Sequence, residues 1–284
     1  MMKYELLPEQ LLHEGTVSED QFFAPSLLSE GDILRTHTAD YWHQLQHLPL
    51  DRKMERAIGF PVRDDLVHRG RYIAHGTLEC ALHAIEHGLA YNIAGGTHHA
   101  FADHGEGFCV FNDIAVAAHC LLERDDLRHH AIDKILIIDL DVHQGNGTAH
   151  IFKNDDRVYT WSMHGAKNYP VRKQKSDLDI GLADGCTDDT YLRILADHLE
   201  PTIDLVRPDM IFYLSGVDVL ATDKLGRLGM SLRGTRQRDD MILAACHRHE
   251  IPVTVSMGGG YSEQLRDIIE AHAGTYRSGM ALYG

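Results

Sequence analysis

The sequence of 284 residues contains no long hydrophobic run. A membrane-spanning helix needs about 18 or more consecutive apolar residues, and no such stretch occurs. The N-terminus, Met-Met-Lys-Tyr-Glu-Leu-Leu-Pro, also lacks the apolar core of a signal peptide. We therefore expect no membrane association and a cytoplasmic location.

Cysteine and basic residues are also scarce. The five cysteines are scattered and none forms a Cys-x-x-Cys pair, which favours reduced thiols over a disulfide framework. There are 27 Lys and Arg against 42 Asp and Glu, and the resulting net charge of −15 argues against direct nucleic-acid binding. The same negative charge would suit a cationic substrate. The composition leaves the oligomeric state open.

The most informative stretch runs from Ile135 to Gly147. Four apolar residues lead into Asp139, Asp141 and His143, which predicts a buried strand with polar groups at its carboxyl end. These three side chains alternate along the chain, so they point to the same side as long as the strand continues. Because burying unpaired charge costs several kcal/mol, a cation or a charged partner is expected here. A polar strand end that caps a turn is the alternative.

Strands and helices are expected to alternate along the chain. Residues 1–50 are expected to be helical with breaks at prolines, and residues 51–71 to form loop or surface. Thr77 is expected to cap the next helix. The predicted strands are 91–94, 135–138, 158–163, 210–214 and 252–256, and the predicted helices are 76–88, 114–122, 145–152, 188–203, 231–248 and a last one ending near 272. This alternation, with 44% apolar residues, predicts one α/β domain over residues 1–284 with a parallel, doubly wound sheet.

One short motif indicates a different chemistry. His83-Ala-Ile-Glu-His87 matches the His-x-x-Glu-His signature of some zinc proteases, in which two His one turn apart bind the metal. Leu82 and Ile85 flank the motif on a packing face, so we favour a surface helix over a protease site. Cys109 lies near another candidate site, and we interpret it as a packing residue.

Polar clusters follow most of the predicted strands and should meet at one edge of the sheet. His98 and His99 follow one strand, Asp218 follows another, and Tyr261 follows a third. Together with Asp141 and His143, Asp218 completes a set of two carboxylates and one imidazole, which suits a catalytic zinc with an open position. Oxygen ligands would also admit Fe²⁺, Mn²⁺ or Co²⁺. The His pair offers a general base and acid, and Tyr261 offers a donor to an oxyanion.

These motifs resemble those of the zinc-dependent histone deacetylase superfamily, which includes acetylpolyamine amidohydrolases and acetoin-utilisation proteins. The resemblance spans roughly residues 92 to 275 and rests on Gly95-Gly-Thr-His-His, Gly107-Phe-Cys, Asp139-Leu-Asp-Val-His, Ser215-Gly-Val-Asp-Val-Leu and Gly258-Gly-Gly-Tyr. It implies a single-domain, three-layer arginase/deacetylase fold with a mainly parallel sheet of about eight strands. Family members have an opening strand before the segment similar to Lys3-Tyr-Glu-Leu-Leu-Pro. Here that strand is expected to be missing or replaced.

The resemblance also implies roles for individual residues. Asp141, His143 and Asp218 would bind Zn²⁺, or Fe²⁺ in its place. His99 would be the main general base and then acid, with His98 as its electrostatic partner. Tyr261 would stabilise the oxyanion, and Asp139 would orient His98. Structural K⁺ would be bound at an inner site by Asp139, Asp141, His143, Ser162 and Met163 and at an outer site by Phe152, Asp155 and Val158. Gly107, Phe108, Tyr169, Leu225 and Gly259 would line a tunnel for the acyl-lysine stem.

Asn146 departs from the pattern of many members, which have Asp at the position behind the second His. With Gln144, it makes the chain most similar to the class IV branch and its bacterial relatives. Because an amide stabilises imidazolium less than a carboxylate does, His99 is expected to be less basic than in members with Asp.

The leading functional prediction is removal of an acetyl or longer acyl group from lysine side chains of proteins or peptides. Acetylpolyamines or other acetylated small amines are the alternative substrates. A non-catalytic acyl-lysine binder is a third possibility, which the intact ligand set and Tyr261 disfavour.

Overall fold

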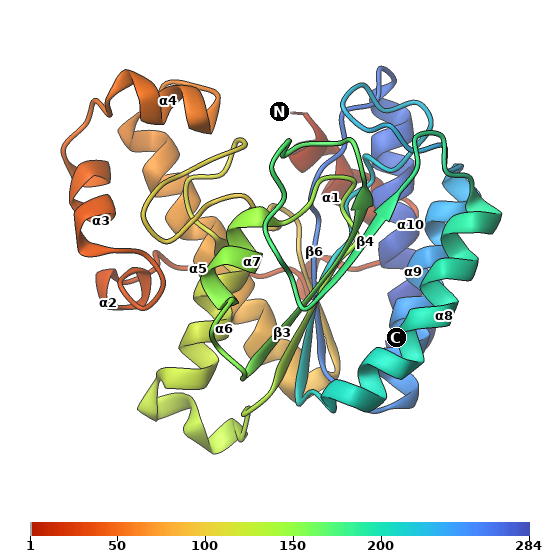
Figure 1. Cartoon of the computed structure of the whole chain (residues 1–284). Helices are drawn as coiled ribbons and strands as arrows, with labels where there is room; N and C mark the ends of the chain where they lie inside the picture. The colour runs from red at the N-terminus through yellow and green to blue at the C-terminus, as the bar shows by residue number, and fades with distance from the viewer. Residues whose placement is uncertain (1) are drawn as a thin grey trace.

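A parallel sheet of six strands forms the centre of the computed structural model, which describes residues 2–284 (Figure 1). Its strand order is β1-β6-β5-β2-β3-β4, and every neighbouring pair is parallel. The strands are β1 (Leu89–Asn92), β2 (Ile135–Asp139), β3 (Val158–Gly165), β4 (Leu178–Leu182), β5 (Met210–Leu214) and β6 (Val253–Ser256). The prediction of one α/β domain with a parallel sheet is confirmed. Among the described residues the sheet has fewer strands than the expected eight or so.

Helices cover both faces of the sheet and give three layers (Figure 1). One layer contains α5 (Asp64–His87), α6 (Asp113–Glu123) and α7 (Asn146–Phe152), and the opposite layer contains α8 (Asp188–Val206), α9 (Leu232–Arg248) and α10 (Leu265–Tyr283). The N-terminal helix α1 (Lys3–His13) lies against α10. The short helices are α2 (Glu30–Ile33), α3 (Ala39–Gln46) and α4 (Arg52–Ile58), with 3-10 turns at Glu19–Gln21 and Asp125–His130.

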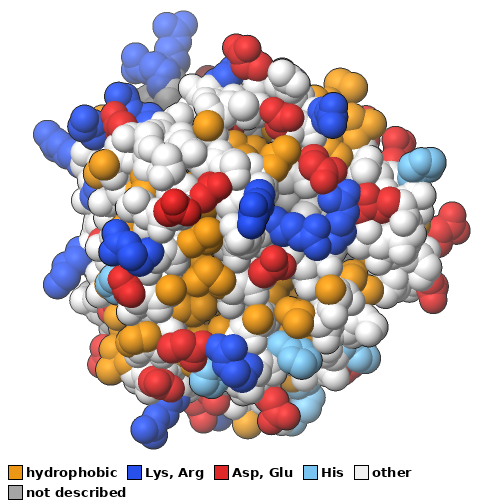
Figure 2. Space-filling model, turned by 90° about the vertical axis from the view of Figure 1, so that its right-hand side faces the viewer, with side chains coloured by type: hydrophobic (Ala, Val, Ile, Leu, Met, Phe, Trp, Pro, Cys, Tyr) orange, Lys and Arg blue, Asp and Glu red, His pale blue; other side chains and the backbone are white. Residues whose placement is uncertain are grey.

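The apolar run of β2 is buried on both faces because the sheet is covered on both sides. Ile135 and Ile137 belong to the core beneath α5 and α6. Leu136 and Ile138 point the other way, into the core beneath α8 and α9. A continuous apolar run is therefore what this central strand requires. The outer face of α8, α9 and α10 mixes acidic and basic side chains with exposed hydrophobic ones (Figure 2). No helix among residues 2–284 combines the length and hydrophobicity needed to cross a bilayer.

Several local predictions were wrong at element boundaries. The helix expected from residue 76 begins at Asp64, with Arg63 as its N-cap, so most of the segment 51–71 is helical. Thr77 is therefore not a cap; its hydroxyl, inside α5, donates to Asp113 at 2.5 Å. Strand β4 was not predicted, because Leu178–Leu182 at the sheet edge is half exposed. The last helix continues to Tyr283, past residue 272.

A fully buried ion pair on α9 joins the helix to the two central loops. The Arg238 guanidinium donates to the backbone carbonyls of Leu140 at 3.2 Å and Gly216 at 2.7 Å. Its charge is balanced by Asp239, 2.8 Å away, and both side chains are fully buried. Asp239 also accepts hydrogen bonds from the hydroxyls of Tyr213 and Thr275. The Arg238 guanidinium therefore connects the loop that follows β2 with the loop that follows β5.

This pair generates a stability prediction. Asp239→Ala leaves the Arg238 cation buried without its partner, and we expect the free energy of unfolding to fall by about 3–5 kcal/mol. The double variant Arg238→Met/Asp239→Leu removes both charges and should lose less than the single variant. Urea denaturation followed by circular dichroism measures both. A double variant as unstable as Asp239→Ala would show that the unpaired charge is not the cause.

Candidate active site

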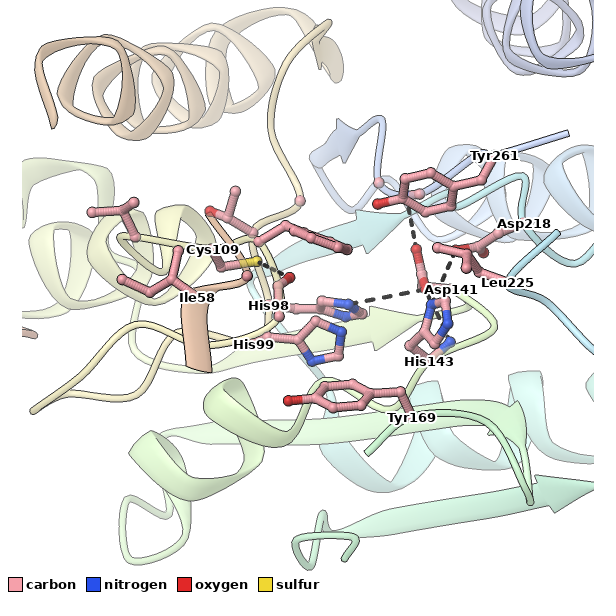
Figure 3. A pocket seen from close by; sticks show the side chains of 18 of the residues that line it. Ile58, His98, His99, Cys109, Asp141, His143, Tyr169, Asp218, Leu225 and Tyr261 are labelled. Carbon is pink, nitrogen blue, oxygen red and sulfur yellow. Dashed lines mark hydrogen bonds and ion pairs between the residues drawn. The ribbon is translucent and has the colours of Figure 1, made fainter. Parts of the chain in front are cut away.

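The polar side chains expected at the strand ends meet at one edge of the sheet. His98 and His99 follow β1, Asp141 and His143 follow β2, and Asp218 follows β5, with Tyr261 after β6. Figure 3 shows these six side chains around one pocket. Tyr261 lies over Asp141, while His98 and His99 lie on the other side of the cluster (Figure 3).

Asp141, His143 and Asp218 form a compact group of candidate metal ligands. One nitrogen or oxygen from each lies within 4.8 Å of the others. His143 Nδ1 is 3.1 Å from Asp141 Oδ1 and 3.2 Å from Asp218 Oδ2. Backbone N–H groups bind the remaining carboxylate oxygens: Gly259 donates to Asp141 Oδ2 at 2.8 Å and Val142 donates to Asp218 Oδ1 at 3.0 Å. The carboxylates are thus aimed by the main chain.

Two observations show that this group suits a cation. Asp218 Oδ2 is buried and receives no hydrogen bond of good geometry, although His143 Nδ1 lies 3.2 Å away, and such an oxygen is costly unless a cation faces it. Burial alone would lower the pKa of His143, but Asp141 and Asp218 outweigh it and raise the pKa to about 10. The two carboxylates therefore favour a positive charge at the imidazole. Two carboxylate oxygens and one imidazole nitrogen fit Zn²⁺ with an open position, and also Fe²⁺.

Gly259 is required by close packing against this group. A Cβ at Gly259 would lie 2.0 Å from Asp218 Oδ2. Any side chain there would push the carboxylate out of place, so the geometry of the site requires glycine at position 259.

The two adjacent histidines have different partners. His98 Nδ1 lies 2.7 Å from Asp139 Oδ2, and His99 Nδ1 lies 2.6 Å from Asn146 Oδ1. Burial alone would lower the pKa of His98, but Asp139 raises it to about 9. Burial, with the positive charge of His98, holds the pKa of His99 well below its usual value. His99 is therefore neutral at neutral pH, beside a cationic His98.

Asp113, which the sequence analysis did not single out, holds the loop that carries this pair. Its carboxylate accepts the backbone N–H groups of Gly96 at 3.0 Å and Thr97 at 2.7 Å. The hydroxyl of Thr97 donates to the same carboxylate at 2.6 Å. Asp113 lies at the first turn of α6, so α6 fixes the direction in which the two imidazoles leave the chain.

The glycine-rich turn before Tyr261 is bound by residues from distant elements. The backbone N–H of Tyr261 donates to Asp223 Oδ2 at 2.6 Å. Lys3 of α1 donates from Nζ to the carbonyl of Gly258 at 3.2 Å. Burial, with the nearby charges of Asp218 and Asp141, raises the pKa of Tyr261, so its phenol stays protonated. Sequence reasoning missed Lys3 and Asp223, because neither belongs to a motif.

A cavity of about 990 Å³ opens onto the group, and all five expected tunnel residues line it. Phe108, Tyr169 and Leu225 are 53%, 40% and 45% exposed, so they lie at its mouth. Gly107 has a positive φ of +53°, and a Cβ there would lie 2.6 Å from the His99 ring. The tunnel wall therefore runs directly past the imidazole. Ile58 and Phe60 also line the cavity and were not predicted.

The positions expected to bind K⁺ lie around β3. Ser162 pairs with Asp139 in the sheet, and Met163 follows it on the same strand. At the outer position, Arg157 donates to both carboxylate oxygens of Asp155, and the backbone N–H of Val158 donates to the main-chain carbonyl of Asp155 at 3.1 Å.

The His83–His87 motif lies at the end of α5, and no third metal-ligating side chain joins it among the residues that the structure describes. The ring of His83 stacks on Phe23 with 4.6 Å between centroids. Within residues 2–284, the grouping of metal-ligating atoms is the one at Asp141, His143 and Asp218. The interpretation as a surface helix is therefore the better one.

Comparison with known proteins agrees with the geometry. The model of the histone deacetylase domain matches residues 1–275. The chain is 41% identical to an uncharacterised protein of Picosynechococcus over 283 residues, which cover 100% of this chain and 93% of that protein. It is 32% identical to histone deacetylase 2 of Arabidopsis thaliana over 268 residues, covering 91% of this chain and 68% of the plant protein.

The chain belongs to the histone deacetylase family. A crystal structure of a histone deacetylase homologue complexed with SAHA has the same fold, with a TM-score of 0.81 and 23% identity, over 96% of this chain and 77% of the other. The family resemblance drawn from the motifs is thereby confirmed.

The donor set of this histone deacetylase domain generates a prediction about metal binding. Asp218→Asn replaces one carboxylate of the candidate ligand group with a neutral amide. After loading with Zn²⁺ and gel filtration, we expect about one ion per chain in the wild type and almost none in the variant. Mass spectrometry of the bound metal measures this.

Asp223→Asn is the matched control. It lies on the same loop but outside the ligand group, so it should retain the ion. Full metal content in Asp218→Asn would exclude Asp218 as a ligand.

Proposed function

We propose that this chain is a metal-dependent amidohydrolase that removes an acetyl or longer acyl group from lysine side chains of proteins or peptides. One observation carries the proposal. The Asp141–His143–Asp218 group and His99 line the same cavity, whose mouth is formed by Phe108, Tyr169 and Leu225. An apolar channel of this kind suits the aliphatic stem of an acyl-lysine.

Asp141, His143 and Asp218 would hold Zn²⁺, with Fe²⁺ as the alternative. The bound ion would polarise the acyl carbonyl and lower the pKa of a water molecule. Structural K⁺ would lie beside them, at the main-chain carbonyls around Asp139 and Ser162 and at a second position near Asp155.

The protein's own groups would carry the proton. Neutral His99 accepts a proton at Nε2 as water attacks the acyl carbon, because its Nδ1 is engaged by Asn146. His99 then returns this proton to the lysine nitrogen as the amide C–N bond breaks. Asp139 holds His98 cationic beside it, and the protonated phenol of Tyr261 donates to the developing oxyanion. The products are a free amine and a carboxylate.

The cellular setting is proposed on the same basis as the chemistry. All five cysteines are buried and unpaired, which suits a reducing compartment such as the cytoplasm. An acylated lysine protein or peptide is the proposed partner.

A substrate panel tests the function. Acetyl-lysine peptides, longer acyl-lysine peptides and acetylpolyamines are incubated with protein loaded with Zn²⁺ or Fe²⁺, and free amine is measured. We expect turnover of acyl-lysine peptides, and none with Asp141→Ala, which lacks a ligand. Turnover of acetylpolyamines alone would move the assignment to small amines. Binding of peptides without turnover with either metal would identify a non-catalytic binder.

Asn146 generates a pH prediction. Asn146→Asp places a carboxylate against His99 Nδ1, which stabilises the imidazolium and raises the pKa of His99. Since the neutral imidazole is the active form, the acidic limb of the kcat/KM profile should move upward by about 1 pH unit. An acidic limb that stays in place would show that residue 146 does not set the basicity of His99.

A further inference from the structure

Glu106 lies directly behind Asn146 and was not among the expected site residues. Its Oε1 accepts a hydrogen bond from Asn146 Nδ2 at 2.7 Å. The hydroxyl of Tyr169 donates to the same oxygen at 2.5 Å. Because Asn146 Oδ1 in turn faces His99 Nδ1 at 2.6 Å, the three residues form a chain from carboxylate to amide to imidazole.

The backbone fixes the position of this carboxylate. Glu106 and Cys109 exchange two backbone hydrogen bonds, at 3.1 Å and 2.9 Å. The turn between them is tied to the end of α4, where Gly107 donates to the carbonyl of Ala57 and Phe108 to that of Ile58. These backbone hydrogen bonds fix the turn that carries Glu106, and the side chain of Glu106 is only 20% exposed.

The carboxylate is ionised at neutral pH. Burial alone would raise the pKa of Glu106, but the His104 imidazole, 3.7 Å away, and hydrogen bonds from Tyr169 and Asn146 outweigh it and lower the pKa. An ionised carboxylate only accepts hydrogen bonds, whereas the amide of Asn146 has a donating end and an accepting end. Two accepting oxygens repel each other, so the NH₂ group of Asn146 must face Glu106.

The direction of the amide decides which nitrogen of His99 carries hydrogen. With its NH₂ group facing Glu106, Asn146 presents only Oδ1 to His99 Nδ1, which must then donate. The lone pair of the neutral ring is left on Nε2. A reversed amide would present NH₂ to Nδ1 and leave the hydrogen on Nε2, where the ring could not accept a proton.

We propose that Glu106 is a positioning residue that fixes the tautomer of His99 by fixing the direction of the Asn146 amide. The inference rests on the proposed function in one respect, that His99 accepts a proton at Nε2. A carboxylate at position 146 would specify this tautomer directly. In this chain Glu106, on a different loop, specifies the tautomer of His99 indirectly by binding Asn146.

Glu106→Gln tests the proposal, because a glutamine amide can face Asn146 with either end. Long-range ¹H–¹⁵N spectra of labelled, Zn²⁺-loaded protein report the tautomer, with the His99 signals assigned by comparison with His99→Gln. We expect hydrogen on Nδ1 alone in the wild type and a mixture of tautomers in Glu106→Gln. The kcat on an acetyl-lysine peptide should fall about 10–100-fold, with KM nearly unchanged.

Two further variants separate this role from a structural one. Tyr169→Phe removes the other donor to Glu106 but keeps Asn146 Nδ2 bound, so the His99 tautomer should stay single. The double variant Asn146→Asp/Glu106→Gln puts an accepting group directly at His99 Nδ1, so it should restore the single tautomer and recover kcat relative to Glu106→Gln.

A single, unchanged tautomer and normal kcat in Glu106→Gln would overturn the proposal, as would a double variant with mixed tautomers. If Glu106→Gln does not fold, Glu106→Asp is the second variant, because its side chain is one methylene shorter and withdraws the carboxylate from Asn146. We expect a mixture of His99 tautomers in Glu106→Asp. A single tautomer in that variant would also overturn the proposal. Spectra are recorded without substrate. Lack of turnover in the wild type would therefore refute the proposed function, while the spectra still decide the role of Glu106.

Discussion

A buried guanidinium behind the active site is the constraint on which the other parts depend. Arg238 joins the carbonyls of Leu140 and Gly216, which lie in the loops after the two central strands. A buried cation costs several kcal/mol unless charge and hydrogen bonds compensate it. Separation of these loops would break that compensation, so the arrangement of Asp141 and Asp218 is fixed before any ligand arrives.

The same principle operates around the whole pocket. Asp113 holds the histidine loop, Asp223 and Lys3 hold the turn before Tyr261, and the backbone of Gly259 aims Asp141. Groups that act on a reacting bond gain from being held in place beforehand, because no free energy is then spent on ordering them during the reaction. The parallel sheet favours this arrangement, because the loops that follow its strands all leave it at one edge.

The sequence was informative where a pattern is local. Buried runs predicted the four strands β2, β3, β5 and β6, and polar residues after the strands predicted which side chains meet. Residues whose partners are distant in sequence could not be found this way. Arg238 lies in a stretch with Arg233, Arg236 and Asp240, which resembles a solvated helix surface. Only tertiary packing shows that Arg238 is fully buried.

Helix starts and edge strands were mispredicted for related reasons. Thr77 resembles a helix cap, but its hydroxyl is used by Asp113 on another helix. Strand β4 pairs only with β3 at the sheet edge, where half-exposed residues weaken the hydrophobic signal. Glu106 stands in a polar loop, and its importance depends on Asn146, which is 40 residues away.

The hydrogen bond from Tyr169 to Glu106 has a consequence for how the mouth of the cavity can change during evolution. Tyr169 forms part of the tunnel mouth, and its ring also packs perpendicular to that of His99, with 5.1 Å between the centroids. Substitutions that widen the mouth at this position will also disturb the surroundings of the imidazole. Changes in which molecules enter the cavity should therefore spare Tyr169 and act on Phe108 and Leu225, whose apolar side chains make no hydrogen bond to Glu106.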